Sequence, residues 1–254
     1  MKKKSLEDRM RNYERIATSS LIPTLPVIIR IDGKGFSKFT KHFAKPYDKA
    51  MAEAMLTTTR RLAENVPHTK CAYTQSDEIS LVLICEPRQE PWFGFRKEKI
   101  VSIVASMATL YFNEALASYV SNVIVTAENE QLLKEYDKAV TKGALFDARA
   151  FNLPDYEVDN YLIWRQNDCN RNSLEALARS VASAKALKNK KAADMHELLY
   201  KHGINWAKQP KHFKDGTYFT RQVVLKPGYN PITKELIAVE RHLWQPTPER
   251  PKIY

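Results

Sequence analysis

Two strand-like apolar runs, each joined to an acidic turn, constrain the fold of this chain more than any other feature. The first run, at 27–31, leads directly into Asp32. The second run, at 79–84, follows Asp77 and Glu78 and alternates in the manner of a strand with one buried face. If the two runs are neighbours in one sheet, the three carboxylates converge at one edge, where charges about 4 Å apart repel by roughly 4 kcal/mol at a surface-like effective dielectric constant. A bound cation would remove that repulsion.

The residues around these turns favour phosphoryl or nucleotidyl transfer. Mg²⁺ takes oxygen ligands from one or two carboxylates together with substrate phosphates. The stretch Gly33-Lys34-Gly35 follows Asp32 and would let the backbone approach such phosphates closely. An Asp-Gly pair after a strand is also an ordinary turn signal, and Ser76-Asp77-Glu78 can simply separate two strands of a hairpin. Each segment alone favours that structural interpretation, whereas the two together favour a metal site.

The order of the elements predicts an α+β fold. Apolar residues at helical spacing predict helices over 5–20, 47–65 and 98–117, and short apolar runs predict strands at 27–31, 70–75, 79–84 and 145–151. This order, βαββαβ, is the split βαβ pattern of ferredoxin-like domains with an antiparallel sheet, which polymerase and cyclase palms share. It predicts a polymerase-type palm without establishing its chemistry. We expect the charged segment 127–143 to be an exposed helix or loop inserted before the last of these strands.

The C-terminal part is predicted to add further helices and a long β-hairpin. A helical pattern begins at 156 and includes Trp164, which we expect in the core rather than on a surface where bases stack. Two strand-like runs, 217–225 and 236–244, flank a turn at 226–231 that contains Pro and Gly. The pattern of such runs around a turn is typical of a hairpin.

The composition is consistent with one large globular unit. The chain has 254 residues, of which 44% are hydrophobic, which is enough for a core with an appended subdomain. We predict a palm-like catalytic domain with an N-terminal helix at 1–154 and a helical and hairpin region at 155–254 packed on the same unit. Three cysteines without metal-ligand spacing predict a reducing, cytoplasmic location. The apolar runs look shorter than a membrane span, and no apolar segment follows the basic start, so we expect no membrane partner.

The net charge favours a polyanionic partner such as nucleic acid. The chain has 40 Lys and Arg against 29 Asp and Glu, which gives a net charge of +11 and a pI of about 9.4. A basic surface can also serve solubility alone, and a run of lysines is usually solvated. Phosphate contacts from lysines in the C-terminal half would position RNA without reading its sequence. The candidates for tRNA binding are Lys188, Lys190, Lys208 and Lys211.

Five short motifs follow one another along the chain. They are Arg30-Ile31-Asp32-Gly33-Lys34-Gly35-Phe36, Phe43-Ala44-Lys45-Pro46, Gln75-Ser76-Asp77-Glu78, Phe146-Asp147-Ala148-Arg149 and Trp164-Arg165-Gln166-Asn167-Asp168-Cys169. In this order they resemble the motifs of the tRNA(His) guanylyltransferase superfamily, the 3′–5′ polymerases that add nucleotides to the 5′ end of tRNA. Five ordered motifs are far more specific than any one of them.

The resemblance implies a polymerase-like palm that works with two Mg²⁺ ions per active site. The ions would be held by the side chains of Asp32 and Asp77 and by the backbone carbonyl of Gly33. Glu78 would be an essential catalytic neighbour, either as a ligand or as a group behind one. Two metals suit the activation of a 3′-hydroxyl and the stabilisation of a pyrophosphate leaving group.

The resemblance also implies the substrates and the assembly. It implies GTP, ATP and other NTPs as substrates, tRNA as the acceptor and a homotetramer. The prediction for Arg96 and Lys99 is weaker than that for the other nucleotide contacts, because a charged segment of this kind is also typical of the start of a helix. The implied nucleotide contacts are Gly33, Lys34, Gly35, Phe36, Ser37, Lys45, Asp48, Ser76, Arg96 and Lys99.

Two departures from the family pattern bear on the substrate. Eukaryotic members have His-Ile-Asn-Asn where this chain has Asn170-Arg171-Asn172-Ser173, and Asp194-Met195-His196-Glu197 replaces an Asp-Lys-Asn-Glu element. The lost residues are associated with 5′ activation and strict tRNA(His) guanylylation. The chain therefore looks more like bacterial and archaeal relatives that resemble enzymes of templated tRNA 5′-end repair. A nucleotide cyclase on the same palm and a non-catalytic RNA-binding protein are the alternatives.

Overall fold

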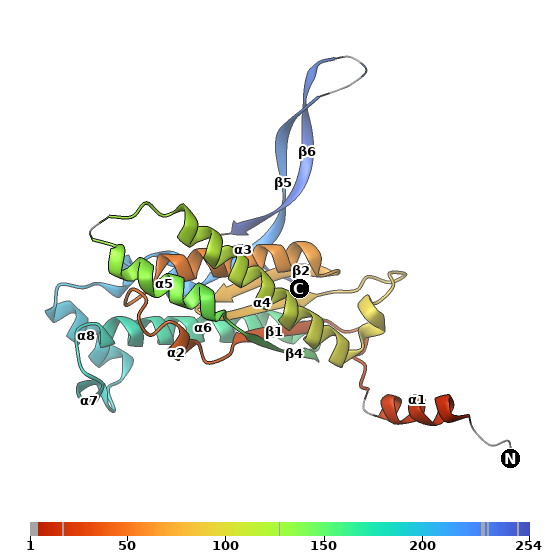
Figure 1. The fold of residues 1–254 in the computed structure, drawn as a ribbon, viewed down its shortest axis with the longest axis horizontal. Coiled ribbons are helices and arrows are strands. Elements are labelled where there is room, and N and C mark those ends of the chain that lie inside the picture. The colour runs from red at the N-terminus through yellow and green to blue at the C-terminus, as the bar shows by residue number, and fades with distance from the viewer. Residues whose placement is uncertain (1–4, 17, 127, 230–231, 233, 248) are drawn as a thin grey trace.

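A six-stranded antiparallel sheet forms the centre of the structure, which is a computed structural model that describes residues 5–16, 18–126, 128–229, 232, 234–247 and 249–254 (Figure 1). The strands are β1 (Val27–Gly33), β2 (Thr69–Gln75), β3 (Glu78–Leu83), β4 (Phe146–Asn152), β5 (Thr217–Tyr229) and β6 (Leu236–Thr247). The helices are α1 (Leu6–Ile16), α2 (Phe36–Phe39), α3 (Lys49–Asn65), α4 (Lys97–Asn122), α5 (Glu130–Lys142), α6 (Asp155–Arg179), α7 (Ala184–Leu187), α8 (Ala192–Lys201) and α9 (Lys211–Asp215). Two 3₁₀ turns, η1 (Trp92–Phe95) and η2 (Trp206–Lys208), complete the elements of the described residues.

The strand order confirms the predicted ferredoxin-like palm. The order across the sheet is β4-β1-β3-β2-β5-β6, and every neighbouring pair is antiparallel. The first four strands in that order, with α3 and α4 as their crossover helices, are the βαββαβ unit. β5 joins the sheet beside β2 and continues with β6 into the hairpin that projects from the body in Figure 1. The hairpin is confirmed, although the 230–231 part of its predicted turn lies outside the described residues.

One face of the sheet is covered by α3 and α4. Alternation along β1 and β3 sends Ile29, Ile31 and Leu81 toward these helices, where they lie in the main core. The helix α4 contributes residues four apart, such as Val104, Ala108 and Phe112, to that core. By length and composition alone, α4 is also long and apolar enough to cross a membrane. The expectation that every apolar run is shorter than a span was therefore wrong for this helix, one side of which packs against the sheet.

The other face of the sheet is covered by α6. Its residues Val158 and Leu162 pack on Ile28 and Val82, and the Tyr161 hydroxyl lies 2.8 Å from the Ser80 hydroxyl. The second half of α6 runs past the sheet and carries a small lobe made of α7, α8, η2 and α9. A separate apolar cluster joins this lobe to α6 through Leu174, Leu177, Leu199 and Phe213.

Three expectations need correction. Trp164 on α6 has 54% of its surface exposed, because the part of the helix face that packs on the sheet is filled by its neighbours Tyr161 and Leu162. The inserted segment contains α5, which is half-buried rather than exposed, since Leu133 and Tyr136 enter the core. The N-terminal helix is shorter than predicted, and α1 has no buried residue and extends away from the sheet in Figure 1.

Asp48 anchors the start of α3. Its carboxylate accepts hydrogen bonds from the backbone N–H groups of Met51 and Ala44 and from the hydroxyl of Tyr136 on α5. The side chain therefore caps α3 and ties it to α5 at the same time.

Replacing Asp48 by Ala is expected to lower the free energy of unfolding by about 2 kcal/mol, because it removes a helix cap and leaves the buried Tyr136 hydroxyl without its acceptor. Urea unfolding followed by circular dichroism measures this. The matched control is Asp137→Ala, which removes an exposed carboxylate on α5 and should change stability little. Equal effects of the two substitutions would contradict the capping role.

Candidate active site

The three predicted carboxylates do converge at one edge of the sheet. Asp32 is the penultimate residue of β1, and its register partner on β3 is Glu78. Asp77 lies in the turn between β2 and β3, and its backbone carbonyl accepts a hydrogen bond of 3.1 Å from the N–H of Gly33. A fourth carboxylate, Asp147, is the register partner of Asp32 on β4. The convergence results from antiparallel pairing of segments more than forty residues apart.

The local electrostatics of this edge disfavour two negative charges. Burial raises the pKa of Asp77, and the nearby Asp32 raises it further. Burial likewise raises the pKa of Asp32, with a contribution from Asp147. Three arginines, Arg30, Arg149 and Arg165, act in the opposite direction on Asp32 but do not cancel the shift. The edge therefore has an excess of buried negative charge that a cation would relieve.

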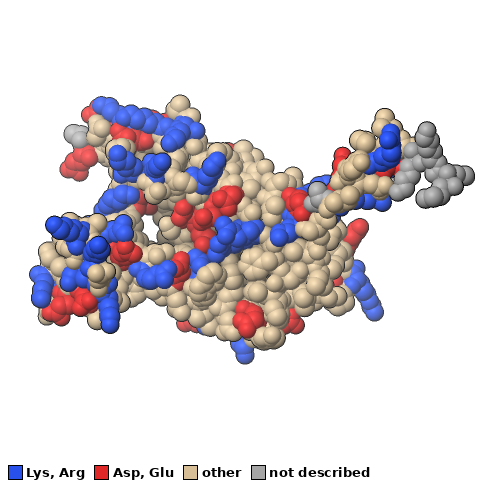
Figure 2. All heavy atoms as spheres, turned by 90° about the horizontal axis from the view of Figure 1, so that it is seen from below, with Lys and Arg blue, Asp and Glu red and all other residues tan. Residues whose placement is uncertain are grey.

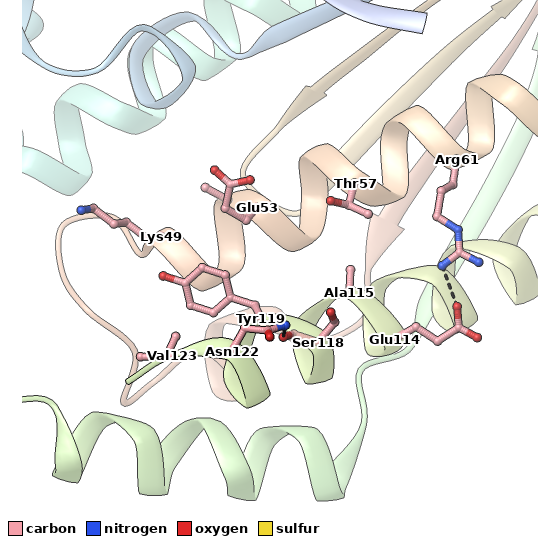
Figure 3. A pocket seen from close by; sticks show the side chains of 11 residues that line it. Lys49, Glu53, Thr57, Arg61, Glu114, Ala115, Ser118, Tyr119, Asn122 and Val123 are labelled. Atoms are coloured by element: carbon pink, nitrogen blue, oxygen red, sulfur yellow. Dashed lines mark hydrogen bonds and ion pairs between the residues drawn. The ribbon is translucent and has the colours of Figure 1, made fainter. Parts of the chain in front are cut away.

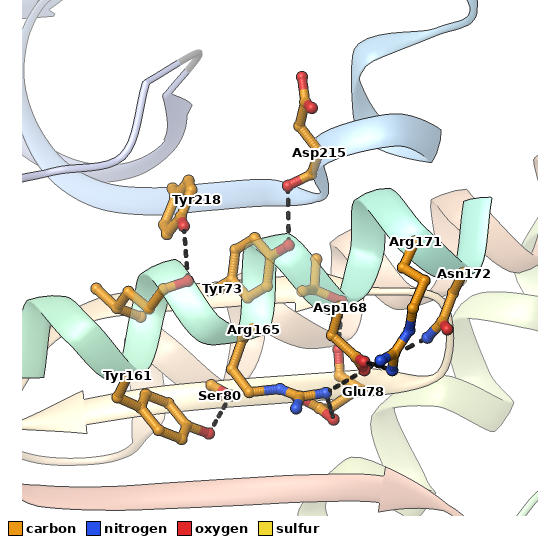
Figure 4. Close-up of polar contacts among 12 residues, drawn as sticks. Tyr73, Glu78, Ser80, Tyr161, Arg165, Asp168, Arg171, Asn172, Asp215 and Tyr218 are labelled. Atoms are coloured by element: carbon orange, nitrogen blue, oxygen red, sulfur yellow. Dashed lines mark hydrogen bonds and ion pairs between the residues drawn. The ribbon is translucent and has the colours of Figure 1, made fainter. Parts of the chain in front are cut away.

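Glu78 is held by an arginine that the sequence had not linked to it (Figure 4). The guanidinium of Arg165 donates to both carboxylate oxygens of Glu78, from Nε at 2.7 Å and from a terminal nitrogen at 2.8 Å. The same guanidinium donates to Asp168, which also pairs with Arg171. Of the two predicted roles for Glu78, this geometry favours the group behind the ligands, since both of its oxygens already accept hydrogen bonds.

The glycine-rich loop after β1 has a shape that only small residues permit. A Cβ atom on Gly33 would lie 2.2 Å from the ring of Phe36, which is buried against Phe112 and Phe146. Gly35 has φ of 68°, a left-handed conformation that favours glycine. Among the described residues, the backbone N–H groups of Gly35, Phe36 and Ser37 have no hydrogen-bond partner. They are therefore free to donate to an anion.

The other predicted nucleotide contacts differ in their exposure to solvent. Lys45 is exposed in the loop between α2 and α3, where its ammonium donates to the Thr40 carbonyl. The exposed Ser76 donates to Asp77 at 3.1 Å. Asp48, in contrast, is 8% exposed and fully used as a cap, so we leave it out of the site proposed below.

Within one copy of the chain, Arg96 and Lys99 lie away from the carboxylates. Both lie at the start of α4, which is joined to the segment before β1 by the bridge between Ser20 and Arg96. Asp32 is at the other end of β1, and six residues of strand span about 20 Å. The crossover helix of this topology begins at the sheet edge opposite to the carboxylates. Here Lys99 lies over the ring of Phe93, 4.5 Å from its centroid.

The carboxylate edge fits Mg²⁺ better than a metal that needs several protein ligands. Among the described residues, no three His, Cys, Asp or Glu side chains are arranged to hold an ion by themselves. Two carboxylates beside a loop with free N–H groups match an ion that completes its coordination with water and substrate phosphates. The crowded charge of Asp32 and Asp77 is the observation that supports such an ion.

A cavity lies elsewhere on the molecule. It has a volume of about 990 Å³ and lies between α3 and α4, lined by residues such as Lys49, Tyr119 and the ion pair of Arg61 with Glu114 (Figure 3). None of the carboxylates of the edge lines it. Its position on the outer side of these helices separates it from the acidic turns, which are the better candidate for chemistry.

Comparison with known proteins agrees with this geometry. Residues 7–154 match the family model described as tRNA(His) guanylyltransferase. The tRNA(His) guanylyltransferase of Schizosaccharomyces pombe is 31% identical over 235 residues, which cover 87% of this chain and 82% of that protein. The chain belongs to the tRNA(His) guanylyltransferase family. It is therefore a nucleotidyltransferase, as the five motifs predict.

Solved structures give the same relationship. A bacterial tRNA(His) guanylyltransferase-like protein in complex with ATP is 33% identical, with a TM-score of 0.77 over 97% of this chain and 93% of that chain. The complex of such a bacterial protein with GTP has a TM-score of 0.73 at 33% identity, over 98% of this chain and 93% of that chain. The predicted likeness to bacterial members of the family is confirmed.

The family motif that departs in this chain has a structural role here. The Asn170 amide donates to the Lys214 carbonyl at 2.7 Å and to Asp215 at 2.9 Å, and Ser173 accepts a hydrogen bond from the indole N–H of Trp206. These contacts fasten α6 to the lobe that contains α9. The sequence singled out Arg165 only as part of a motif. A glutamate at the start of a buried strand requires a cationic partner, and this requirement is what could have pointed to Arg165.

Replacing Asp77 by Asn is expected to stabilise the protein in EDTA at neutral pH. Because the folded-state pKa of Asp77 is raised above the unfolded value, stability falls as the pH rises from the unfolded pKa through the folded pKa, and the amide removes this penalty. We expect a rise in melting temperature of about 2–4 °C, the shift that about 1 kcal/mol produces in a chain of this size. The difference should shrink toward pH 4, where unfolded and folded carboxyls both become protonated. The exposed control Asp137→Asn should give no rise, and a fall for Asp77→Asn would contradict the charge argument.

Proposed function

We propose that this chain is a template-directed 3′–5′ nucleotidyltransferase that repairs the 5′ ends of truncated tRNAs. The observation that carries the proposal is the convergence of Asp32 and Asp77 next to the Gly33–Gly35 turn, which combines a cation site with phosphate-binding backbone. Family membership supports the direction of chain growth and the tRNA acceptor. GTP, ATP and other NTPs are the proposed substrates, which is supported by relatives solved with ATP and GTP.

The proposed metal ligands are the side chains of Asp32 and Asp77 and the backbone carbonyl of Gly33. Two Mg²⁺ ions bound there would supply activation of the attacking 3′-hydroxyl and charge neutralisation at the pyrophosphate leaving group. Glu78 keeps the β3 side of the site in place, because its bidentate pairing with Arg165 fixes the backbone next to Asp77.

The proposed triphosphate site is the loop that follows β1. The free N–H groups of Gly35, Phe36 and Ser37 would donate to phosphate oxygens, and the burial of the Phe36 ring keeps these groups in position. Lys34 and Lys45 are exposed and would add positive charge, with the Ser76 hydroxyl on the opposite turn.

The proposed tRNA surface extends over the lobe that follows α6. Lys188, Lys190, Lys208 and Lys211 are exposed there, and only Lys211 has a nearby carboxylate, Asp215 at 3.2 Å, among the described residues. Figure 2 shows Lys and Arg gathered at the end of the molecule away from the N-terminal helix, where two lobes are separated by a gap. Such a surface would hold RNA by its phosphates. A homotetramer and a cytoplasmic location are further proposals that rest on the family resemblance and on the cysteines.

End repair is favoured over strict tRNA(His) guanylylation by the altered motif on α6. In this chain Asn170 and Ser173 bond to the C-terminal lobe, and Asp194 accepts a hydrogen bond from the N–H of Lys191 at the start of α8. These positions are used to hold the lobe. The family functions associated with the replaced histidine and lysine therefore have no counterpart at these positions.

Replacing Asp32 or Asp77 by Ala is expected to abolish nucleotide addition, by at least about a thousandfold, because metal ions supply several kcal/mol of transition-state stabilisation. The assay follows incorporation of labelled GTP into a tRNA that lacks its first nucleotide and carries a 5′-triphosphate. Circular dichroism should show both variants folded, and Asp137→Ala is the matched control with normal activity expected.

Retained addition in either variant would overturn the metal-site assignment. The alternatives give different products in the same experiment. A cyclase would form a cyclic nucleotide from NTP without RNA, and an RNA-binding protein without catalysis would bind tRNA and leave it unextended.

A further inference from the structure

An exposed indole lies over two arginines beside the acidic edge. Trp164 on α6 has 54% of its surface exposed. The guanidinium of Arg165 lies 4.4 Å from its ring centroid, that of Arg30 lies 5.9 Å away, and the ring of Tyr161 contacts it edge-on. Cation–π contacts and an aromatic edge therefore hold the indole from the protein side. Its solvent side is open, which is the arrangement of a stacking platform.

Two arginines, Arg30 and Arg149, face each other across adjacent strands near the acidic edge. Arg30 on β1 is the register partner of Arg149 on β4, and strand alternation places both on the sheet face covered by α6. Like charges directly opposite each other destabilise a strand pair. The Nε of Arg30 is buried and has no hydrogen-bond partner among the described residues. The exposed Arg149 lies 3.7 Å from Asp147 and, like Arg30, close enough to Asp32 to oppose the rise in its pKa.

These features are displaced from the proposed triphosphate site. Arg30 lies two residues before Asp32 on β1, and Arg149 lies two residues after Asp147 on the antiparallel β4, in each case a distance of about 7 Å. They share the face of α6, whereas the ring of Phe36 in the glycine-rich loop packs toward α4 on the other face. An anion bound by the arginines would therefore reach the carboxylates from the side opposite to the loop. A nucleotidyl transfer needs such a second anion, because both of its reactants carry phosphate.

We infer that Arg30, Arg149 and Trp164 form the binding site for the 5′-terminal nucleotide of the acceptor RNA, with the guanidiniums on its 5′-phosphate and the indole stacked on its base. The inference rests on the proposed function and adds the residues that position the acceptor. Arginines suit phosphate because their N–H groups bind it in a fixed fork. Stacking on an aromatic ring tolerates any base, which an enzyme that extends different 5′ ends needs. A free nucleotide shares this chemistry, and the experiment separates the two sources.

Binding in EDTA tests the site without turnover. Fluorescence anisotropy at one fixed salt concentration would compare a labelled tRNA with a 5′-phosphate and the same tRNA with a 5′-hydroxyl, and equilibrium dialysis would measure GTP. We expect Arg149→Gln to weaken the 5′-phosphorylated RNA by about tenfold, the effect of one charge-assisted hydrogen bond. The 5′-hydroxyl RNA and GTP should be nearly unaffected. The control Arg179→Gln removes an exposed arginine of α6 that pairs with Glu175 and should change none of the three.

The indole has its own test. Trp164→Ala should weaken both RNAs by about fivefold or more, since stacking contributes about 1–3 kcal/mol per base, whereas Trp164→Phe should keep most of the affinity. Binding of RNA should quench tryptophan fluorescence in the wild type and quench it much less in Trp164→Phe.

Two results would overturn the inference. Equal weakening of phosphorylated and hydroxyl RNA by Arg149→Gln would show only general charge attraction. Loss of GTP affinity with unchanged RNA affinity would assign the site to the free nucleotide. If either occurs while the wild type still extends truncated tRNA, the acceptor site is wrong and the proposed function stands.

Discussion

The buried ion pair between Arg165 and Glu78 is the interaction on which the arrangement of the site depends. Their side chains are only 6% and 11% exposed, and the pairing is bidentate. Truncating one partner of such a pair typically costs about 3–5 kcal/mol, because the other charge stays buried and unpaired. The pair fixes α6 across the end of β3, next to Asp77. The position of α6 in turn determines where Trp164 and the C-terminal lobe lie.

The antiparallel sheet then turns distant segments into one site. The register places Asp32 beside both Glu78 and Asp147, so that strands far apart in the chain contribute to a single edge. The two sides of this edge differ. The loop after β1 offers free N–H groups, whereas the face under α6 offers the guanidiniums of Arg30 and Arg149. We therefore propose that the carboxylates lie between a site for the incoming nucleotide on the loop side and a site for the acceptor on the α6 side.

Much of the fold could be predicted from the sequence because it depends on local periodicity. Alternation at 79–84 and helical spacing in α4 and α6 predicted the elements and the convergence of Asp32 with Asp77. The exposure of Trp164 could not be predicted, because spacing on α6 does not say which of several apolar residues faces the sheet. The distance of Arg96 from the carboxylates could not be predicted for a similar reason. Motif order is preserved along the chain, whereas the crossover topology places the start of α4 at the far edge.

The central claim is that nucleotides are added at the 5′ end under the direction of an opposing base. The most direct measurement uses four tRNAs that lack the first nucleotide and differ only in the base opposite the gap, each offered all four NTPs with Mg²⁺. We expect the added nucleotide, identified by sequencing the 5′ end, to change with the opposing base according to Watson–Crick pairing. Addition of G to all four tRNAs would contradict templated repair, and addition to none would contradict 3′–5′ polymerisation itself.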